Sequence, residues 1–366
     1  MHAGVADPLS GDRRRCRRRP RSGEPGSPAF TTLANADDWV EIEVFGKEHE
    51  DFLRNYLELP YGIPSHDTIQ RVFAIVPSGF LENFQKKWNE LLNSEEGEKV
   101  KRLHAIDGKT QRGNGNKNQK GNHIVSAVDE RGFCLGQKRV EEKTNEITAI
   151  PELIDSLNIK GTIITTDAMG TQTAIVKKIR KKRADYVLAL KGNQGSLLEE
   201  VREYFSDGGL LKKCAYKKKV EKARGKIEKR EYWQTEDISW LSQKKEWMGL
   251  KSIILTRNTI TGADGKETVE ERYFISSLPT EIEETARAVR GHWMIESYHW
   301  HLDVTFREDG NHTLEKQAAY NLNIIRKLAL NILKISEVGR CPMSMKKKRY
   351  AIGTNPEKYL DELMNL

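Results

Sequence analysis

The sequence has few cysteines and no long apolar run. Its four cysteines, Cys16, Cys134, Cys214 and Cys341, lie far apart without a CxxC pair, which argues against a zinc knuckle or a disulfide framework. No apolar run reaches the roughly 20 residues that cross a bilayer, and 31% of the residues are charged. We therefore expect a cytoplasmic protein that has no membrane partner.

The excess of basic charge is concentrated at the N-terminus. The 366 residues include 61 Lys and Arg against 53 Asp and Glu, and residues 1–30 hold seven Arg against three acids. This balance permits a polyanionic partner without requiring one. Residues 1–35 are rich in Arg and Pro and show no apolar period, which predicts a disordered tail. The tail is either a basic nucleic-acid-binding arm or sequence outside the folded unit.

Helical periodicity begins after this tail. Apolar residues recur at spacings near 3.6 over residues 36–97, which predicts a small helical N-terminal domain. Such domains often bind nucleic acid, but no spacing here marks a recognition helix.

Residues 98–195 have the pattern of an α/β unit, with strands and helices in the order β-β-β-α-β-α-β. This order is typical of a ribonuclease-H-like catalytic core, a mixed five-stranded sheet with flanking helices. The first strand ends at Asp107 and the fourth ends at Asp167. Because the ends of these two strands are neighbours in that topology, we expect the two acids to meet. The expected strands are 103–107, 123–128, 133–140, 161–167 and 186–190, and the expected helices are 145–157 and 171–183.

A long segment, residues 196–280, separates this unit from the last helices. It is dense in Lys and Arg between residues 212 and 230 and has three strand patterns after them, which predicts a β-rich basic insertion. Trp247 and the other tryptophans of the segment are expected in its core. Residues 281–340 are expected to complete the catalytic core, and residues 341–366 to form a basic C-terminal tail.

Glu296 is the most conspicuous acid of the region after the insertion. In a helix over residues 285–302, Glu296 shares a stripe with Val289, Trp293 and Trp300. A carboxylate on such an apolar face requires a counter-charge, hydrogen bonds or a metal ion. Taken alone, the pattern also fits an ordinary ion pair with Arg290.

Three carboxylates brought together from two strand ends and one helix are the ligands of a two-metal phosphoryl-transfer site. Magnesium prefers oxygen ligands and keeps several waters, so Asp107, Asp167 and Glu296 suffice for a pair of ions. We therefore expect two Mg²⁺ ions as cofactors, with Mn²⁺ as a substitute. No serine, histidine and aspartate arrangement indicates a covalent nucleophile.

The motifs around these acids resemble those of the ISAs1-type transposases, which include the H-repeat-associated proteins and belong to the IS4-like DDE class. The resemblance extends from about residue 36 to residue 334, with the motifs in the family order. The matching segments are 105–110 (AIDGKT), 165–172 (TTDAMGTQ), 190–194 (LKGNQ), 292–296 (HWMIE) and 302–309 (LDVTFRED).

The resemblance implies a DDE transposase that cleaves and joins DNA, with Asp107, Asp167 and Glu296 as catalytic metal ligands. It implies double-stranded DNA partners, namely the element ends and the target, and a homodimer in a synaptic complex. Residues beside the three acids are expected to support the site, and basic or amide residues nearby are expected to contact DNA. The supporting residues are Asp303, His292 and His299, and the DNA-contacting residues are Lys109, Lys191, Asn193, Gln194, Arg224 and Lys226.

Two departures from the family pattern leave a second hypothesis open. The Arg-rich and Pro-rich residues 1–30 stand where the family has an apolar helical stretch, and Asp303 occupies a position that holds Lys in many IS4-like enzymes. Asp303 is either a supporting acid or the partner of a lysine. The alternative function is an inactive transposase remnant that acts only as a DNA-binding protein.

Overall fold

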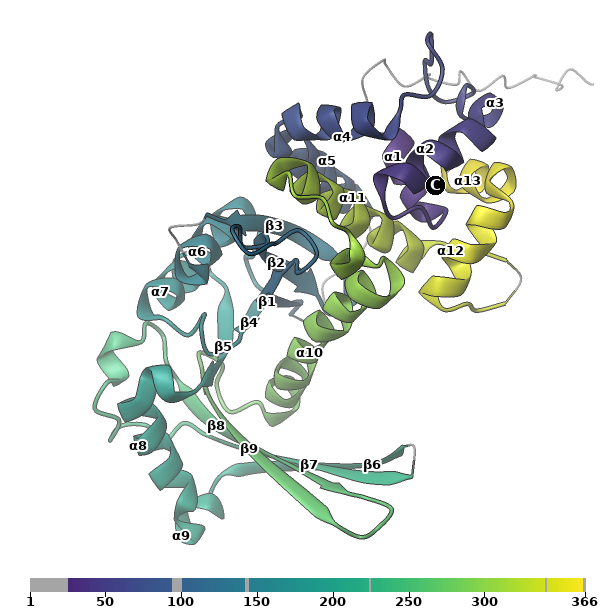
Figure 1. Ribbon diagram of the computed structural model, residues 1–366. Coiled ribbons are helices and arrows are strands. Elements are labelled where there is room, and N and C mark those ends of the chain that lie inside the picture. The colour runs from purple at the N-terminus through teal and green to yellow at the C-terminus, as the bar shows by residue number, and fades with distance from the viewer. Residues whose placement is uncertain (1–25, 94–100, 142–144, 224, 340, 365–366) are drawn as a thin grey trace, which may run out of the picture.

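The computed structural model describes residues 26–93, 101–141, 145–223, 225–339 and 341–364 (Figure 1). Within these ranges, no helix combines the length and apolar character that a membrane span needs. The α-helices are α1 (Gly26–Leu33), α2 (Trp39–Glu48), α3 (Glu50–Leu53), α4 (His66–Ile75), α5 (Ser78–Asn93), α6 (Glu146–Ser156), α7 (Thr173–Lys181), α8 (Gly195–Ser206), α9 (Gly208–Leu211), α10 (Ile282–Trp300), α11 (Lys316–Ile335), α12 (Met345–Thr354) and α13 (Pro356–Met364). The strands are β1 (Leu103–Thr110), β2 (His123–Asp129), β3 (Cys134–Val140), β4 (Ile163–Thr166), β5 (Asp185–Leu190), β6 (Ala215–Ala223), β7 (Lys226–Thr235), β8 (Ser252–Thr261) and β9 (Glu267–Ser276).

The strands form one mixed sheet in the order β3-β2-β1-β4-β5-β9-β8-β7-β6. Strand β4 is parallel to both β1 and β5, whereas β2 and β3 are antiparallel to their neighbours. The expected mixed α/β sheet is therefore confirmed, but it has nine strands and not five. Strand β9 pairs directly with β5, so the strands of residues 196–280 extend the sheet.

Alternate residues of the central strands face opposite sides of the sheet and enter different cores. On β4, Ile164 packs with α6, α7 and α8, while Ile163 packs against α10. On β5, Leu188 belongs to the same core as Ile164, and Val187 belongs to the same core as Ile163. The central strands β4 and β5 are thus buried on both faces, which explains their continuous apolar runs.

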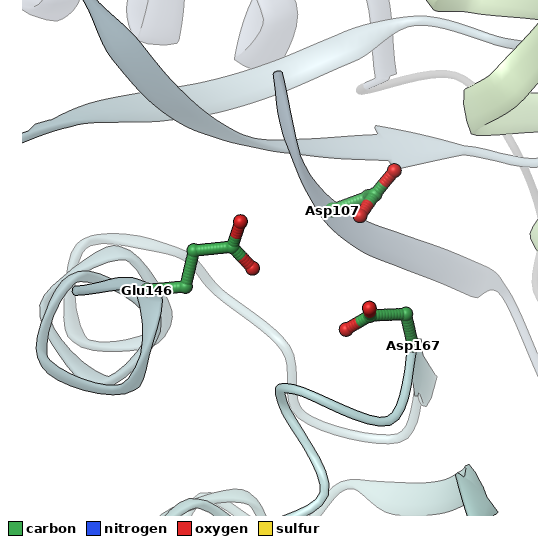
Figure 2. Close-up of side chains that lie close together, drawn as sticks. All are labelled: Asp107, Glu146 and Asp167. Atoms are coloured by element: carbon green, nitrogen blue, oxygen red, sulfur yellow. The ribbon is translucent and has the colours of Figure 1, made fainter. Parts of the chain in front are cut away.

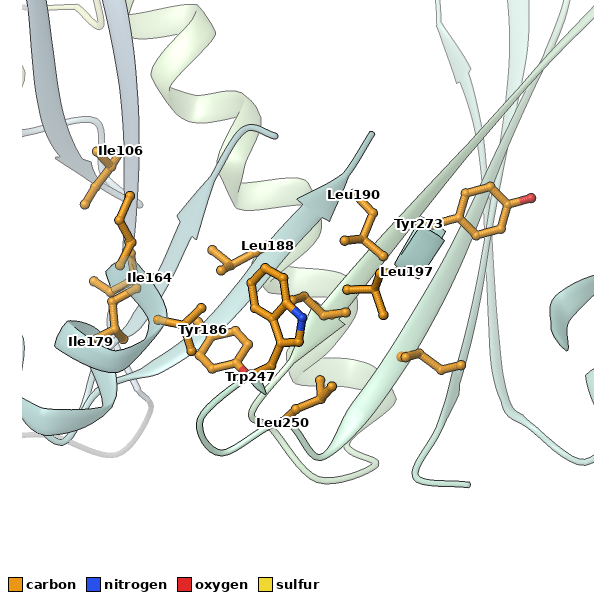
Figure 3. Close-up of a cluster of buried hydrophobic side chains, with 14 of the residues drawn as sticks. Ile106, Ile164, Ile179, Tyr186, Leu188, Leu190, Leu197, Trp247, Leu250 and Tyr273 are labelled. Atoms are coloured by element: carbon orange, nitrogen blue, oxygen red, sulfur yellow. The ribbon is translucent and has the colours of Figure 1, made fainter. Parts of the chain in front are cut away.

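The segment 196–280 has no separate core. Figure 3 shows Trp247 beside Tyr186, and both belong to one hydrophobic cluster with Leu250 and with Ile179 of α7. Trp247 is only 2% exposed. The predictions that Trp233 and Trp247 are buried are correct, whereas Trp240 is 39% exposed. The cluster of Trp247 includes residues of the first part of the chain. The boundary at residue 196 therefore does not separate two independent hydrophobic cores.

The basic run that follows α9 forms the edge strand β6. Its acid Glu221 contacts Lys219 of the same strand and, across the hairpin, Arg230 of strand β7, both at 2.8 Å. Lys217 also forms an ion pair with Glu283 of α10. Part of the basic charge is thus neutralised within the protein, and a lysine-rich edge also discourages pairing with another sheet.

Helix α11 joins the N-terminal helices to the rest of the protein (Figure 1). Helices α1, α4, α5 and α12 all contact it, and most of its residues are buried. Two expected tails are wrong in part, because residues 26–33 form α1 and residues 345–364 form α12 and α13. Their apolar residues Phe30, Leu33, Ile352 and Leu360 are buried in one shared cluster. Residues 1–25 of the expected disordered tail lie outside the described residues.

Arg349 of α12 fastens the C-terminal helices to the N-terminal region. Its guanidinium is fully buried and forms an ion pair with Asp37 at 2.5 Å. It also donates hydrogen bonds to the carbonyl oxygens of Thr32 and Thr305 and lies over the Phe306 ring. One side chain therefore connects segments that are distant in the sequence.

We expect Arg349→Ala to lower the free energy of unfolding by about 3–5 kcal/mol, because it leaves the buried Asp37 carboxylate without this partner. Urea denaturation is the measurement. The control Lys347→Ala removes an exposed basic residue of the same helix and should change stability by less than about 0.5 kcal/mol. Equal effects of the two substitutions would contradict this structural role of Arg349.

Candidate metal centre

The register of two parallel strands places Asp107 beside Asp167. Ile106 of β1 lies opposite Thr166 of β4, and Asp107 and Asp167 are the next residues of the chain after them. Strand β4 ends at this point as expected. Strand β1 continues to Thr110, because β2 pairs with it along its whole length. The prediction that the two acids meet is correct, whereas the predicted end of the first strand is not.

The loop after β4 holds the Asp167 carboxylate. Its Oδ1 accepts hydrogen bonds from the backbone N–H groups of Met169 at 3.0 Å and Gly170 at 3.3 Å. Asn193 donates its side-chain amide to the Ala168 carbonyl oxygen at 2.6 Å. In the same way Gln194 donates to the Thr171 carbonyl oxygen at 2.9 Å. These amide donors fasten the loop, and the DNA contacts expected for Asn193 and Gln194 stay predictions.

The structure adds a carboxylate that the sequence reasoning missed, Glu146 at the start of α6. One ligand oxygen each from Asp107, Glu146 and Asp167 lies within 4.8 Å of the others. Figure 2 shows the three side chains pointing toward a shared space. In the sequence Glu146 is only an acid in the first turn of a predicted helix, where acids are common because they complement the helix dipole. The position of Glu146 in the sequence therefore does not distinguish a metal ligand from an acid that only complements the helix dipole.

Burial and mutual repulsion raise the pKa values of the paired aspartates. Burial, followed by the charge of Asp167, raises the pKa of Asp107 to about 7, and the charges of Glu146 and Glu296 act in the same direction. Burial also raises the pKa of Asp167, and the charge of Glu146 adds to this effect. Charges concentrated in this way disfavour the metal-free ionised site, and a cation would relieve the repulsion.

Glu296 lies near this group but outside the set of converging oxygens. It is exposed on α10, and its charge is close enough to raise the pKa of Asp107. The expected apolar stripe around it is divided, because Val289 is buried while Trp293 and Trp300 are 36% and 55% exposed. Glu296 therefore faces solvent between two exposed indole rings.

Two histidines of α10 lie beside the strands of the aspartates, His299 near Asp107 and His292 against Thr165 of β4. His299 Nδ1 lies 3.7 Å from Asp107 Oδ2, and burial lowers the pKa of His299 to about 3. His292 Nδ1 lies 3.0 Å from the Thr165 hydroxyl oxygen, and burial lowers its pKa to about 4. Neither ring carries a positive charge that would compete with a metal ion at neutral pH.

Asp303 is engaged in a separate ion-pair network. Lys109 Nζ contacts carboxylate oxygens of Asp303 at 2.7 Å, Glu308 at 2.9 Å and Asp309 at 3.3 Å. Although burial opposes the charge, these acids raise the pKa of Lys109. Asp303 is therefore the partner of a lysine, and the DNA contact expected for Lys109 stays a prediction. Asp303 lies in a π-helical turn, His301–Thr305, that continues α10.

The remaining basic residues occupy two exposed places. Lys191 lies at the end of β5, close enough to Asp167 for its charge to lower the pKa of that acid. Lys226 lies at the start of β7, in the hairpin turn. Arg224 lies outside the described residues.

The donor set fits a hard divalent cation. Asp107, Glu146 and Asp167 offer oxygen atoms only, they are partly exposed, and their repulsion is of the kind that a divalent ion offsets. A zinc site would require thiolate or imidazole ligands in the same group. Within the described part of the chain no such mixed group is found.

Comparison with known proteins decides the family. Residues 98–332 match the family described as "Transposase DDE domain", and residues 29–89 match the family described as "DDE_Tnp_1-associated". The chain belongs to the DDE-domain transposases. The alignment covers the strands and helices that carry Asp107, Glu146, Asp167 and Glu296, so all four acids lie within the matched domain.

The similarity of this transposase to two relatives extends over nearly the whole chain. It is 38% identical to "Putative transposase YncI" of Escherichia coli O157:H7, over 91% of this chain and 86% of that protein. It is 36% identical to "H repeat-associated putative transposase YhhI" of Escherichia coli strain K12, over 88% and 87% of the two chains. A shorter relative, "Inactive transposase YbfQ" of the same strain, is 50% identical over 42 residues, 12% of this chain and 50% of that protein.

The raised pKa of Asp107 predicts a pH-dependent stability of the metal-free protein. Its folded value of about 7 exceeds the ordinary 3.8. The stabilisation from proton binding is therefore complete below about pH 4 and is lost as the pH rises through about 7. In EDTA, we expect Asp107→Asn to gain stability relative to the wild type between pH 5 and 8, as measured by urea denaturation. The exposed control Asp264→Asn should show no such gain. If the difference in unfolding free energy between Asp107→Asn and the wild type did not change with pH, the raised pKa would be contradicted.

Proposed function

We propose that the protein catalyses metal-dependent DNA strand cleavage and strand transfer of an insertion element. The observation that carries this proposal is the adjacency of Asp107 and Asp167 through the β1–β4 register, with Glu296 nearby. The match of residues 98–332 to the transposase domain supports it. The strand order β3-β2-β1-β4-β5 further supports a ribonuclease-H-like catalytic core of the IS4-like, ISAs1 type.

In this proposal Asp107, Asp167 and Glu296 hold two Mg²⁺ ions, for which Mn²⁺ can substitute. Such ions activate the attacking water or 3′-hydroxyl and stabilise the leaving oxygen when they are bound. The protein supplies the ligand oxygens and keeps Asp167 in place through the backbone N–H groups of Met169 and Gly170. The position of Glu296 on a separate helix gives the site a side that is open to a DNA backbone.

DNA contacts are proposed for the exposed lysines beside the site. Lys191 lies close to Asp167, where a scissile phosphate would be bound, and Lys226 extends the basic surface along the β6–β7 hairpin. Lysines at such positions neutralise phosphates and give affinity without sequence preference. The substrates are then the two element ends and a target duplex, held by a homodimer in the cytoplasm.

Neutral substitution of any of the three acids is expected to abolish cleavage without unfolding the protein. Asp107→Asn, Asp167→Asn and Glu296→Gln each remove a metal ligand and leave the exposed lysines unchanged. The assay is cleavage of a plasmid that carries the gene with its flanking DNA, in Mg²⁺ or Mn²⁺, together with DNA affinity by fluorescence anisotropy. The control Asp264→Asn should cleave normally. A variant at position 107, 167 or 296 that still cuts would remove that residue from the assignment.

The alternative function is that of a DNA-binding remnant. The exposed position of Glu296 outside the converging oxygens favours it. In that case the wild-type protein binds the same plasmid with a steep salt dependence and cuts it with neither metal ion.

The contact of Lys191 with phosphate predicts a change in the salt dependence of DNA binding. Lys191→Gln should reduce the magnitude of the slope of log Kobs against log [salt] by about 0.9, the amount for one phosphate contact. Fluorescence anisotropy at several salt concentrations measures the slope. Lys177→Gln, an exposed lysine of α7, is the matched control and should leave the slope unchanged. Equal slopes for wild type and Lys191→Gln would contradict the contact.

A further inference from the structure

The acids that converge in the metal centre include one outside the proposed triad. Glu146 offers an oxygen within 4.8 Å of ligand oxygens of both Asp107 and Asp167, which Glu296 does not. We propose that Glu146 is a further ligand of the ion held by Asp107 and Asp167, and that His123 positions it. This inference rests on the proposed metal-dependent function and extends its ligand set from three carboxylates to four.

The spacing of the oxygens suits one small cation. Ligand oxygens at 2.0–2.1 Å from Mg²⁺ lie at most about 4.2 Å from each other across the ion. The 4.8 Å limit that encloses the three oxygens is only slightly larger. Small rotations of the side chains would therefore bring all three oxygens onto one ion, without a movement of the strands or of α6.

His123 holds the Glu146 carboxylate by a direct hydrogen bond. The ring Nε2 lies 2.6 Å from Glu146 Oε1, and the ring Nδ1 lies 2.7 Å from the Thr110 hydroxyl oxygen. The ring is thus fixed at both nitrogens between the end of β1 and the start of α6. His123 does not belong to the converging set. Outer groups that orient a ligand in this way support affinity without touching the ion.

Gly108 leaves the space that this pair occupies. A Cβ atom at this position would lie 2.2 Å from Glu146 Oε1 and 2.6 Å from His123 Nε2. Gly108 lies within regular β-strand pairing, so alanine suits its backbone, and the obstructing atoms are the ends of flexible side chains. Alanine should therefore displace the Glu146 carboxylate without removing any acid from the protein.

A purely structural explanation for Glu146 makes the opposite prediction. If Glu146 only complements the dipole of α6 and pairs with His123, its loss lowers stability and leaves metal affinity unchanged. If Glu146 is a ligand, its loss also weakens metal binding. Metal affinity therefore distinguishes the two explanations, because only the loss of a ligand lowers it.

The test measures Mn²⁺ binding to the full chain without DNA, by electron paramagnetic resonance of free Mn²⁺. Glu146→Gln, His123→Ala and Gly108→Ala should each weaken binding by about tenfold or more. Glu152→Gln removes an exposed acid from the same helix and should bind as the wild type does. Circular dichroism and urea denaturation in EDTA establish that each variant is folded.

Asp107→Asn separates failure of this inference from failure of the proposed function. If Mn²⁺ binding depends on Asp107 and is unchanged by Glu146→Gln, the fourth ligand is wrong and the proposed metal centre stands. If the wild type does not bind Mn²⁺, or binds it independently of Asp107, both are wrong. A loss with Glu146→Gln but not with Gly108→Ala or His123→Ala would retain the ligand and overturn the positioning by His123.

Discussion

The parallel pairing of β1 with β4 is the constraint on which the site depends. It places Ile106 opposite Thr166 and so sets Asp107 and Asp167 side by side. Burial disfavours the charged form of Asp107, and the neighbouring charge of Asp167 repels it. Together they raise the pKa of Asp107 to about 7. The sheet holds them together because both strands are buried on both faces by apolar side chains. Hydrophobic packing thus maintains an electrostatically unfavourable arrangement that a divalent cation would stabilise.

Buried ion pairs hold the surrounding helices in place. Lys109, just beyond Asp107 on β1, binds acids of the segment that follows α10, so the strand with the first aspartate and the region with Glu296 are connected. Arg349 and Asp37 connect the C-terminal and N-terminal helices on the far side of this region. Removing either partner of such a pair destabilises the protein, because it leaves a buried charge uncompensated. The geometry of the metal centre is therefore determined by contacts well outside it.

Much of the fold was predictable, because its strands are short apolar runs bounded by turns. The first five strands and the helices between them follow from periodicity, and the family motifs locate the acids. The extent of the sheet was not predictable. Strand β9 joins β5 through backbone hydrogen bonds, which leave no pattern in side chains. The basic strand β6 was not predicted, because its lysines form no apolar pattern. Lys217 pairs with Glu283 of α10, and Lys219 pairs with Glu221 of its own strand.

The sequence by itself determined the residue types of the site, the order of the elements and the family. Local periodicity and motifs are properties of neighbouring residues, and they suffice for these conclusions. Only the tertiary structure decided which charges meet. It brought Glu146 and His123 to Asp107, paired Asp303 with Lys109, and left Glu296 exposed. These partners come from separate elements, and their distances are fixed by strand register and helix packing, which no local pattern encodes.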